Sequence, residues 1–165
     1  MFHDLARQFR QLTEKHRIPF IVNDRVDICM SVDADGVHLG QNDFPVMAAR
    51  KMLGKKKIIG LSTHNMQQAL EAHKEPVDYI GLGPVFATSS KKKADPAVGL
   101  NKLRTILQQT NLPCFAIGGI SPGNIGEIVS AGAKRIAMIT AVTHAKDPAM
   151  VTKQLRNALK HGHNT

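Results

Sequence analysis

The sequence predicts an α/β fold built around one parallel sheet. Short apolar segments recur along the chain, each ends in glycine or polar residues, and amphipathic helical patterns lie between them. The apolar segments are continuous rather than alternating, which is typical of strands that are buried on both faces of a sheet. The chain has 165 residues and no evident linker, so residues 1–165 are expected to form a single domain.

The predicted elements alternate along the chain. Six segments are too short for helices and are predicted to be strands; they cover residues 19–24, 36–40, 58–62, 79–83, 114–119 and 135–140. Apolar stripes at helical spacing cover residues 2–12, 45–53, 66–73, 100–107, 121–129 and 147–159. Proline supports the starts of three of these helices, at Pro45, Pro122 and Pro148. Alternating strands and helices imply right-handed crossovers between parallel strands.

The charge of the chain favours anionic partners. Lysine and arginine number 22 and acidic residues number 13, which gives a net charge of +9. Nucleic acid and phosphorylated metabolites would both be attracted by this charge. Aromatic residues make up only 4% of the chain and tryptophan is absent, so no base-stacking platform is evident. We therefore expect small phosphorylated substrates and no nucleic acid.

The sequence also predicts the compartment. No apolar run approaches the roughly 20 residues that are needed to span a bilayer. The first residues lack the apolar core of a secretory signal. The two cysteines, Cys29 and Cys114, lie in apolar surroundings and are interpreted as free thiols in a reducing compartment. The chain is accordingly expected to be cytoplasmic and to have no membrane partner.

Polar residues and glycines gather where the predicted strands end. Parallel strands place their carboxyl ends at one edge of the sheet, where barrels and open α/β sheets bind ligands. The residues found at these ends are Asn23, Asp24, Gln41, Asp43, Ser62, Thr63, His64, Thr88, Ser90, Lys91, Gly118, Gly119 and Thr140.

Three groups among these residues suit phosphate chemistry. Asp24 and Asp43 follow successive strands and could hold Mg²⁺ against substrate phosphates, although a loop hydrogen bond for Asp24 and a helix cap for Asp43 are simpler explanations. The Gly118-Gly119 turn lets backbone amides approach a phosphate. Residues 83–91 supply three hydroxyls and a lysine for diphosphate oxygens, or else form a flexible lysine-rich loop.

Together these segments resemble the thiamine-phosphate synthase family, to which the thiazole tautomerases are related. The matching segments appear in the family's order and are residues 22–27, 36–43, 60–64, 81–91, 116–120 and 139–141. The resemblance covers the chain from about Ile18 to Leu159. Several ordered motifs are far more specific than any one of them.

The resemblance implies a TIM (β/α)8-barrel-like fold and a condensation reaction. A hydroxymethylpyrimidine diphosphate and a thiazole phosphate would give thiamine phosphate and pyrophosphate. Asp24 and Asp43 would hold Mg²⁺ and, with Lys91, would be catalytic. The pyrimidine diphosphate would contact Asn23, Ser62 and Lys91, and the thiazole phosphate would contact Thr88, Ser89, Ser90, Gly119, Ile139 and Thr140.

The sequence departs from the family pattern at its start. The family has eight strands and about six βα units are evident here, so the barrel is expected to be N-terminally truncated, with a basic motif missing. Exposed parallel edges would favour a homo-oligomer or a complementing chain. Ser90 stands where the family usually has threonine.

Three other functions stay open. A thiazole tautomerase would need no metal-bound diphosphate, so the two aspartates favour the synthase. A non-catalytic phosphometabolite-binding or regulatory remnant would keep the phosphate site without turnover. A nucleic-acid binder would lose affinity steeply with salt.

Overall fold

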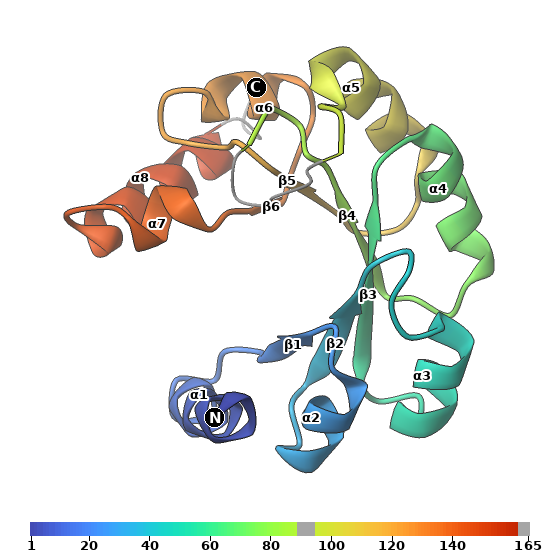
Figure 1. The fold of residues 1–165 in the computed structure, drawn as a ribbon. Helices are drawn as coiled ribbons and strands as arrows, with labels where there is room; N and C mark the ends of the chain where they lie inside the picture. Colours follow the sequence, from blue (N-terminus) through green and yellow to red (C-terminus); the bar gives the residue numbers. More distant parts are fainter. Residues whose placement is uncertain (89–94, 162–165) are drawn as a thin grey trace.

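The computed structural model describes residues 1–88 and 95–161, and its centre is one curved, fully parallel sheet (Figure 1). The six predicted strands are all present, and neighbours in the sequence are neighbours in the sheet. They are β1 (Ile21–Asn23), β2 (Gly36–Leu39), β3 (Ile58–Thr63), β4 (Tyr79–Leu82), β5 (Cys114–Ile117) and β6 (Ile136–Ala137). β1 and β6 therefore form the two ends of the sheet.

Helices cover the convex side of this sheet and its two ends (Figure 1). The helices on the convex side are α2 (Val26–Ser31), α3 (Val46–Leu53), α4 (Met66–Glu71), α5 (Gly99–Gln109) and α6 (Ile125–Ser130). A 3₁₀ turn, η1 (Ala72–Lys74), continues α4. α1 (Phe2–Lys15) lies near β1, whereas α7 (Thr140–Thr143) and α8 (Pro148–His161) lie beyond β6. Within the described ranges, every helix is too short or too polar to cross a bilayer.

The core lies between the sheet and the convex layer of helices. Alternate strand residues such as Val37, Leu39 and Ile59 are fully buried, and Leu103 and Ile106 of α5 are buried with them. Burial of such side chains contributes about 1.5–3 kcal/mol each. The intervening strand residues face the concave side and are free to line a site.

Four elements differ most from the prediction. α2 was not predicted, because six residues are too few to show a helical stripe, although Val26, Ile28 and Cys29 are buried on it. α6 begins at Ile125 rather than at Ser121-Pro122, since Asn124 accepts a hydrogen bond from the Ser121 backbone N–H and closes a turn there. β6 ends at Ala137, so Ile139 and Thr140 lie beyond the strand and Thr140 opens the unpredicted α7.

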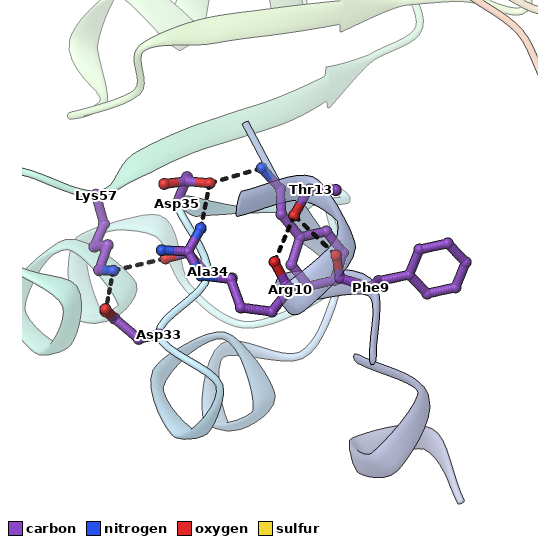
Figure 2. A network of polar contacts seen from close by, with 8 residues as sticks. Phe9, Arg10, Thr13, Asp33, Ala34, Asp35 and Lys57 are labelled. Carbon is purple, nitrogen blue, oxygen red and sulfur yellow. Dashed lines mark hydrogen bonds and ion pairs between the residues drawn. The ribbon is translucent and has the colours of Figure 1, made fainter. Parts of the chain in front are cut away.

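Polar contacts attach α1 to the edge of the sheet at which the strands begin (Figure 2). Asp35 Oδ2 accepts hydrogen bonds from the Phe20 backbone N–H at 2.8 Å and from Arg10 Nη1 at 2.9 Å. On the same edge, the Lys57 ammonium contacts the Asp33 carboxylate and donates to the Ala34 carbonyl at 2.7 Å. Asp35 thus joins α1, the start of β1 and the start of β2.

Asp35→Ala should destabilise the fold by about 1–3 kcal/mol, because it leaves the Phe20 N–H and the Arg10 guanidinium without their acceptor. Urea unfolding followed by circular dichroism measures this loss. Asp4→Ala is the control: Asp4 is exposed and pairs with the chain terminus and with Arg7 near the start of α1, so it should cost clearly less. Equal losses for the two variants would show that Asp35 is not an anchor.

Candidate functional site

The concave face of the sheet borders a cavity of about 710 Å³. Its lining comes from all six strands and from the loops at their carboxyl ends. Among the residues predicted from the sequence, the structure brings together Asn23, Ser62, Thr88, Gly119, Ile139 and Thr140. Part of the set of residues predicted at the strand ends therefore lines one cavity, whereas Asp24, Gln41 and Asp43 do not line it.

Asp24 and Asp43 lie at the carboxyl ends of β1 and β2. Asp24 directly follows β1 with φ 63°, and its backbone N–H donates to the His38 carbonyl at 2.8 Å, one residue beyond the strand pairing. Asp43 Oδ2 accepts from the Gly40 backbone N–H at 2.7 Å and closes the turn after β2. This contact is not the expected helix cap, because Pro45 occupies the cap position of α3 and Asp43 is not bonded to that helix.

Asp43 faces a second, smaller cavity of about 350 Å³, which Gly40 and Gln41 also line. Gln41 reaches from this turn toward the main cavity, since its Nε2 donates to the Ser62 carbonyl at 2.6 Å. The turn after β2 is thus bonded to the end of β3. The two aspartates share one edge of the sheet, but neither Asp24 nor Asp43 is part of the main cavity wall.

These two carboxylates are of the ligand type that suits a magnesium ion whose other ligands come from substrate phosphates and water. Both are exposed, and hard carboxylate oxygens are ligands that Mg²⁺ prefers. Across residues 1–88 and 95–161, no group of three or more His, Cys, Asp or Glu side chains is arranged to hold a metal. Mg²⁺ is commonly bound by one or two carboxylates together with substrate phosphates and water, which matches this donor set.

The Gly118-Gly119 turn packs closely against the segment that follows β4. Gly119 has φ 66°, and a Cβ atom there would lie 2.7 Å from Phe86 Cβ and 2.8 Å from the Ala87 carbonyl oxygen. The Phe86 N–H donates to the Gly118 carbonyl at 3.1 Å. Glycine is therefore needed at position 119, both for its backbone conformation and for this close approach. The approach holds the chain that leads to Thr88 beside the end of β5.

Three predicted residues, Ser89, Ser90 and Lys91, lie outside the described residues, so their roles stay predictions. The described chain resumes at Asp95, whose carboxylate lies 3.6 Å from His64 Nδ1. The same nitrogen is 2.6 Å from the Gly83 carbonyl oxygen. His64 thus lies between the end of β4 and Asp95.

Sequence reasoning missed a pair of aromatic side chains inside the cavity. His38 Nδ1 lies 2.9 Å from the Tyr79 hydroxyl, and His38 Nε2 lies 2.9 Å from Ser62 Oγ. Tyr79 also packs edge-on against Phe115, with ring centroids 5.1 Å apart. The available signal was a histidine inside an otherwise apolar strand, with a glycine, Gly60, in the next strand to make room for it.

The ionisation of Tyr79 gives a direct check of this arrangement. Burial raises the pKa of Tyr79 from 10.0 to about 12. Between these values the unfolded chain loses the phenolic proton while the folded chain keeps it, so this group makes stability fall as pH rises through that window. Tyr79 is the only tyrosine in the sequence, so tyrosinate absorbance reports it alone. If the tyrosinate absorbance of the folded protein rises with a midpoint near pH 10, the buried position of Tyr79 is contradicted.

Comparisons with known proteins agree with the fold and with the motifs. A family model described as thiamine monophosphate synthase matches residues 1–142. The chain is 46% identical over 151 residues to a thiamine-phosphate synthase from Chloroflexus aurantiacus, and the match covers 92% of this chain and 69% of that protein. Identity to the Clostridium novyi thiamine-phosphate synthase is 42%, over 94% of this chain and 76% of that one. A Prochlorococcus marinus thiamine-phosphate synthase is 45% identical, and the match covers 94% of this chain but only 44% of that protein.

Solved structures also resemble this chain in fold. A thiamine phosphate pyrophosphorylase from Pyrococcus furiosus superposes with a TM-score of 0.87 at 38% identity, over 97% of this chain and 76% of that one. A 3-hexulose-6-phosphate synthase from Salmonella typhimurium has a TM-score of 0.74 at 16% identity, over 96% of this chain and 81% of that one, which shows a shared fold only. The predicted barrel-like α/β fold with about six βα units is confirmed.

Proposed function

The chain belongs to the thiamine monophosphate synthase family, and we propose that it condenses 4-amino-5-hydroxymethyl-2-methylpyrimidine diphosphate with 4-methyl-5-(2-phosphooxyethyl)thiazole. In this reaction the bond between the pyrimidine methylene carbon and the diphosphate oxygen breaks. The thiazole nitrogen supplies the electron pair for the new bond to that carbon, and pyrophosphate leaves. The names of the relatives support this synthase activity over the tautomerase.

The observation that carries the proposal is the convergence of the predicted contact residues on one cavity. Asn23 and Ser62 come from the β1 and β3 side, whereas Thr88, Gly119 and Thr140 come from the β4 to β6 side. The two groups suit two ligands in one cavity, with the pyrimidine diphosphate near β1–β3 and the thiazole phosphate near β4–β6. A volume of about 710 Å³ falls in the range of about 300–1,000 Å³ that is usual for ligand pockets.

The chain's own groups act in this proposal by binding and orientation. Asn23 and Ser62 would hold the diphosphate, while Thr88, Ser89, Ser90, Gly119, Ile139 and Thr140 would hold the thiazole phosphate. Bringing both substrates together in a reactive orientation lowers the entropic part of the barrier. No protein nucleophile is required by this chemistry.

Asp24 and Asp43 would hold Mg²⁺ at the edge of the cavity, and Lys91 would contact the diphosphate. When it is bound, Mg²⁺ supplies positive charge that stabilises the departing pyrophosphate. The exposed carboxylates at the ends of β1 and β2 support this assignment. The Gln41 contact to the Ser62 carbonyl supports it further, because it attaches the turn that carries Asp43 to the main cavity.

The setting in the cell is also a proposal. Cys29 and Cys114 are both buried free thiols, which supports a reducing compartment such as the cytoplasm. Association with a second copy, or with a chain that contributes further strands, stays a prediction.

Product detection tests the function. The purified chain is incubated with both phosphorylated substrates, with and without Mg²⁺, and thiamine phosphate is measured by mass spectrometry. Magnesium-dependent product is expected. A folded chain that binds both substrates but forms no product would overturn the enzymatic proposal in favour of a binding protein.

A further inference from the structure

Two aromatic side chains meet on the concave face in one layer of the sheet. His38 on β2 is the register partner of Gly60 on β3, and Gly60 is the partner of Tyr79 on β4. A Cβ atom on Gly60 would lie 2.1 Å from Tyr79 Cζ and 2.4 Å from His38 Nδ1. The two rings therefore meet directly over this glycine, and no other residue fits there without moving them.

Gly81 on β4, two residues after Tyr79, also leaves room for the His38 ring. A Cβ atom on Gly81 would lie 3.2 Å from His38 Cε1, a closer approach than side chains normally make. Tyr79 is fixed on its other side by its edge-on contact with Phe115. Both rings are thus held in position by the backbone and by packing.

Each ring nitrogen of His38 has a polar partner. Nδ1 faces the Tyr79 hydroxyl and Nε2 faces Ser62 Oγ, both at 2.9 Å. Neutral histidine has one donor and one acceptor nitrogen, so the three groups can form a chain of hydrogen bonds in either of two directions. The direction decides whether the Ser62 hydroxyl donates into the cavity or toward the histidine.

Binding of the proposed ligand requires one of these directions. Ionised diphosphate oxygens accept hydrogen bonds and do not donate them, so Ser62 must donate to bind one; this step rests on the proposed function. Ser62 can donate to the ligand and still satisfy His38 only if Nε2–H donates to Ser62 Oγ. Nδ1 must then accept from Tyr79, whose hydroxyl keeps its proton because burial raises its pKa to about 12.

We propose that Tyr79 and His38 are positioning residues that set the direction of the Ser62 hydrogen bond. Tyr79 donates to Nδ1 and thereby fixes the proton of His38 on Nε2. His38 then donates to Ser62 and turns the serine hydroxyl toward the diphosphate. Neither aromatic residue needs to touch the substrate for this role.

The tautomer of His38 tests the proposal without any measurement of activity. Nitrogen NMR of histidine-labelled protein at about pH 8, where an ordinary histidine is neutral, distinguishes the two tautomers. The His38 signals are assigned by their loss in His38→Gln. We expect the proton on Nε2 in the wild type and a mixture of tautomers in Tyr79→Phe, which removes only the hydroxyl. Phe115→Leu is the matched control, since it alters the packing of Tyr79 but keeps that hydroxyl and should keep the tautomer. A proton on Nδ1 in the wild type would overturn the proposal.

A double-mutant cycle tests whether Tyr79 acts through Ser62. We expect Tyr79→Phe to lower kcat/KM for the pyrimidine diphosphate by roughly 3- to 10-fold, the effect of one hydrogen bond, with KM for the thiazole phosphate unchanged. In a Ser62→Ala background the same change should have no further effect. If the two substitutions instead lower kcat/KM by factors that multiply in the double variant, Tyr79 does not act through Ser62. That result would overturn the proposed hydrogen-bond relay from Tyr79 through His38 to Ser62. A wild type that has the expected tautomer but forms no product would support the relay and contradict the proposed synthase activity.

Discussion

We expect Asp24→Asn to lower the rate of thiamine phosphate formation by about 100-fold or more, a few kcal/mol of transition-state stabilisation. The change removes a negative oxygen donor from the edge where Mg²⁺ would meet the diphosphate. It preserves the shape of the side chain. Asparagine also tolerates the positive φ of 63° at this position, so the fold should be unaffected.

Turnover is measured over a range of Mg²⁺ concentrations, and the variant should need more metal to reach half of its maximal rate. Asp33→Asn is a closely matched control. Asp33 also has a positive φ, 51°, but it lies before β2 at the opposite edge of the sheet, where it contacts Lys57. It should keep wild-type turnover. An unchanged rate in Asp24→Asn would remove the metal role of Asp24.

The sheet could be predicted from the sequence because each strand is a short apolar run between helical stripes. Segments 58–62 and 79–83 differ from β3 and β4 by only one residue at one end. Elements of one turn or so, such as α2 and α7, carry no periodic signal. The end of β6 depends on pairing with β5, which stops at Ile117–Ala137, and the local sequence does not reveal this limit.

The position of the main cavity could also be predicted, because parallel strands must place their carboxyl ends together. This rule alone is enough to bring Asn23, Ser62 and Thr140 to one end of the sheet, where they line one cavity. The rule shows which strand ends are neighbours but not where each side chain points. It therefore did not reveal that Asp43 faces a separate cavity.

A histidine inside an apolar strand was visible in the sequence, but the contact between His38 and Tyr79 could not be predicted, for a related reason. The two residues are 41 positions apart and meet only because of the sheet register, which aligns both with Gly60. Neither residue lies at a strand's carboxyl end. A polar ring on the inner face of a barrel becomes visible as part of a site only when its neighbours across the sheet are known.

Gly119→Ala should combine a loss of stability with a loss of thiazole phosphate binding. Alanine at φ 66° costs about 1–2 kcal/mol in backbone strain. Its Cβ would also meet Phe86 Cβ at 2.7 Å, which adds an overpacking cost of about 1–3 kcal/mol. Relief of this contact displaces the chain that leads to Thr88, so thiazole phosphate affinity should fall at least about 10-fold, which equals about 1.4 kcal/mol.

Gly132→Ala is the control that separates backbone strain from the collision with Phe86. Gly132 has φ 97°, and a Cβ atom there would have no neighbouring atom within 4 Å, so alanine carries the backbone strain without a collision. Urea unfolding should show a larger loss for Gly119→Ala than for Gly132→Ala, and calorimetry with the thiazole phosphate should show weakened binding only in Gly119→Ala. If the two variants lose equal stability and bind this ligand equally well, the close approach of residues 86–87 to Gly119 does not shape the site. If they differ as expected, the second glycine of the turn is required because the end of β5 and the segment after β4 must touch for Thr88 to reach the cavity.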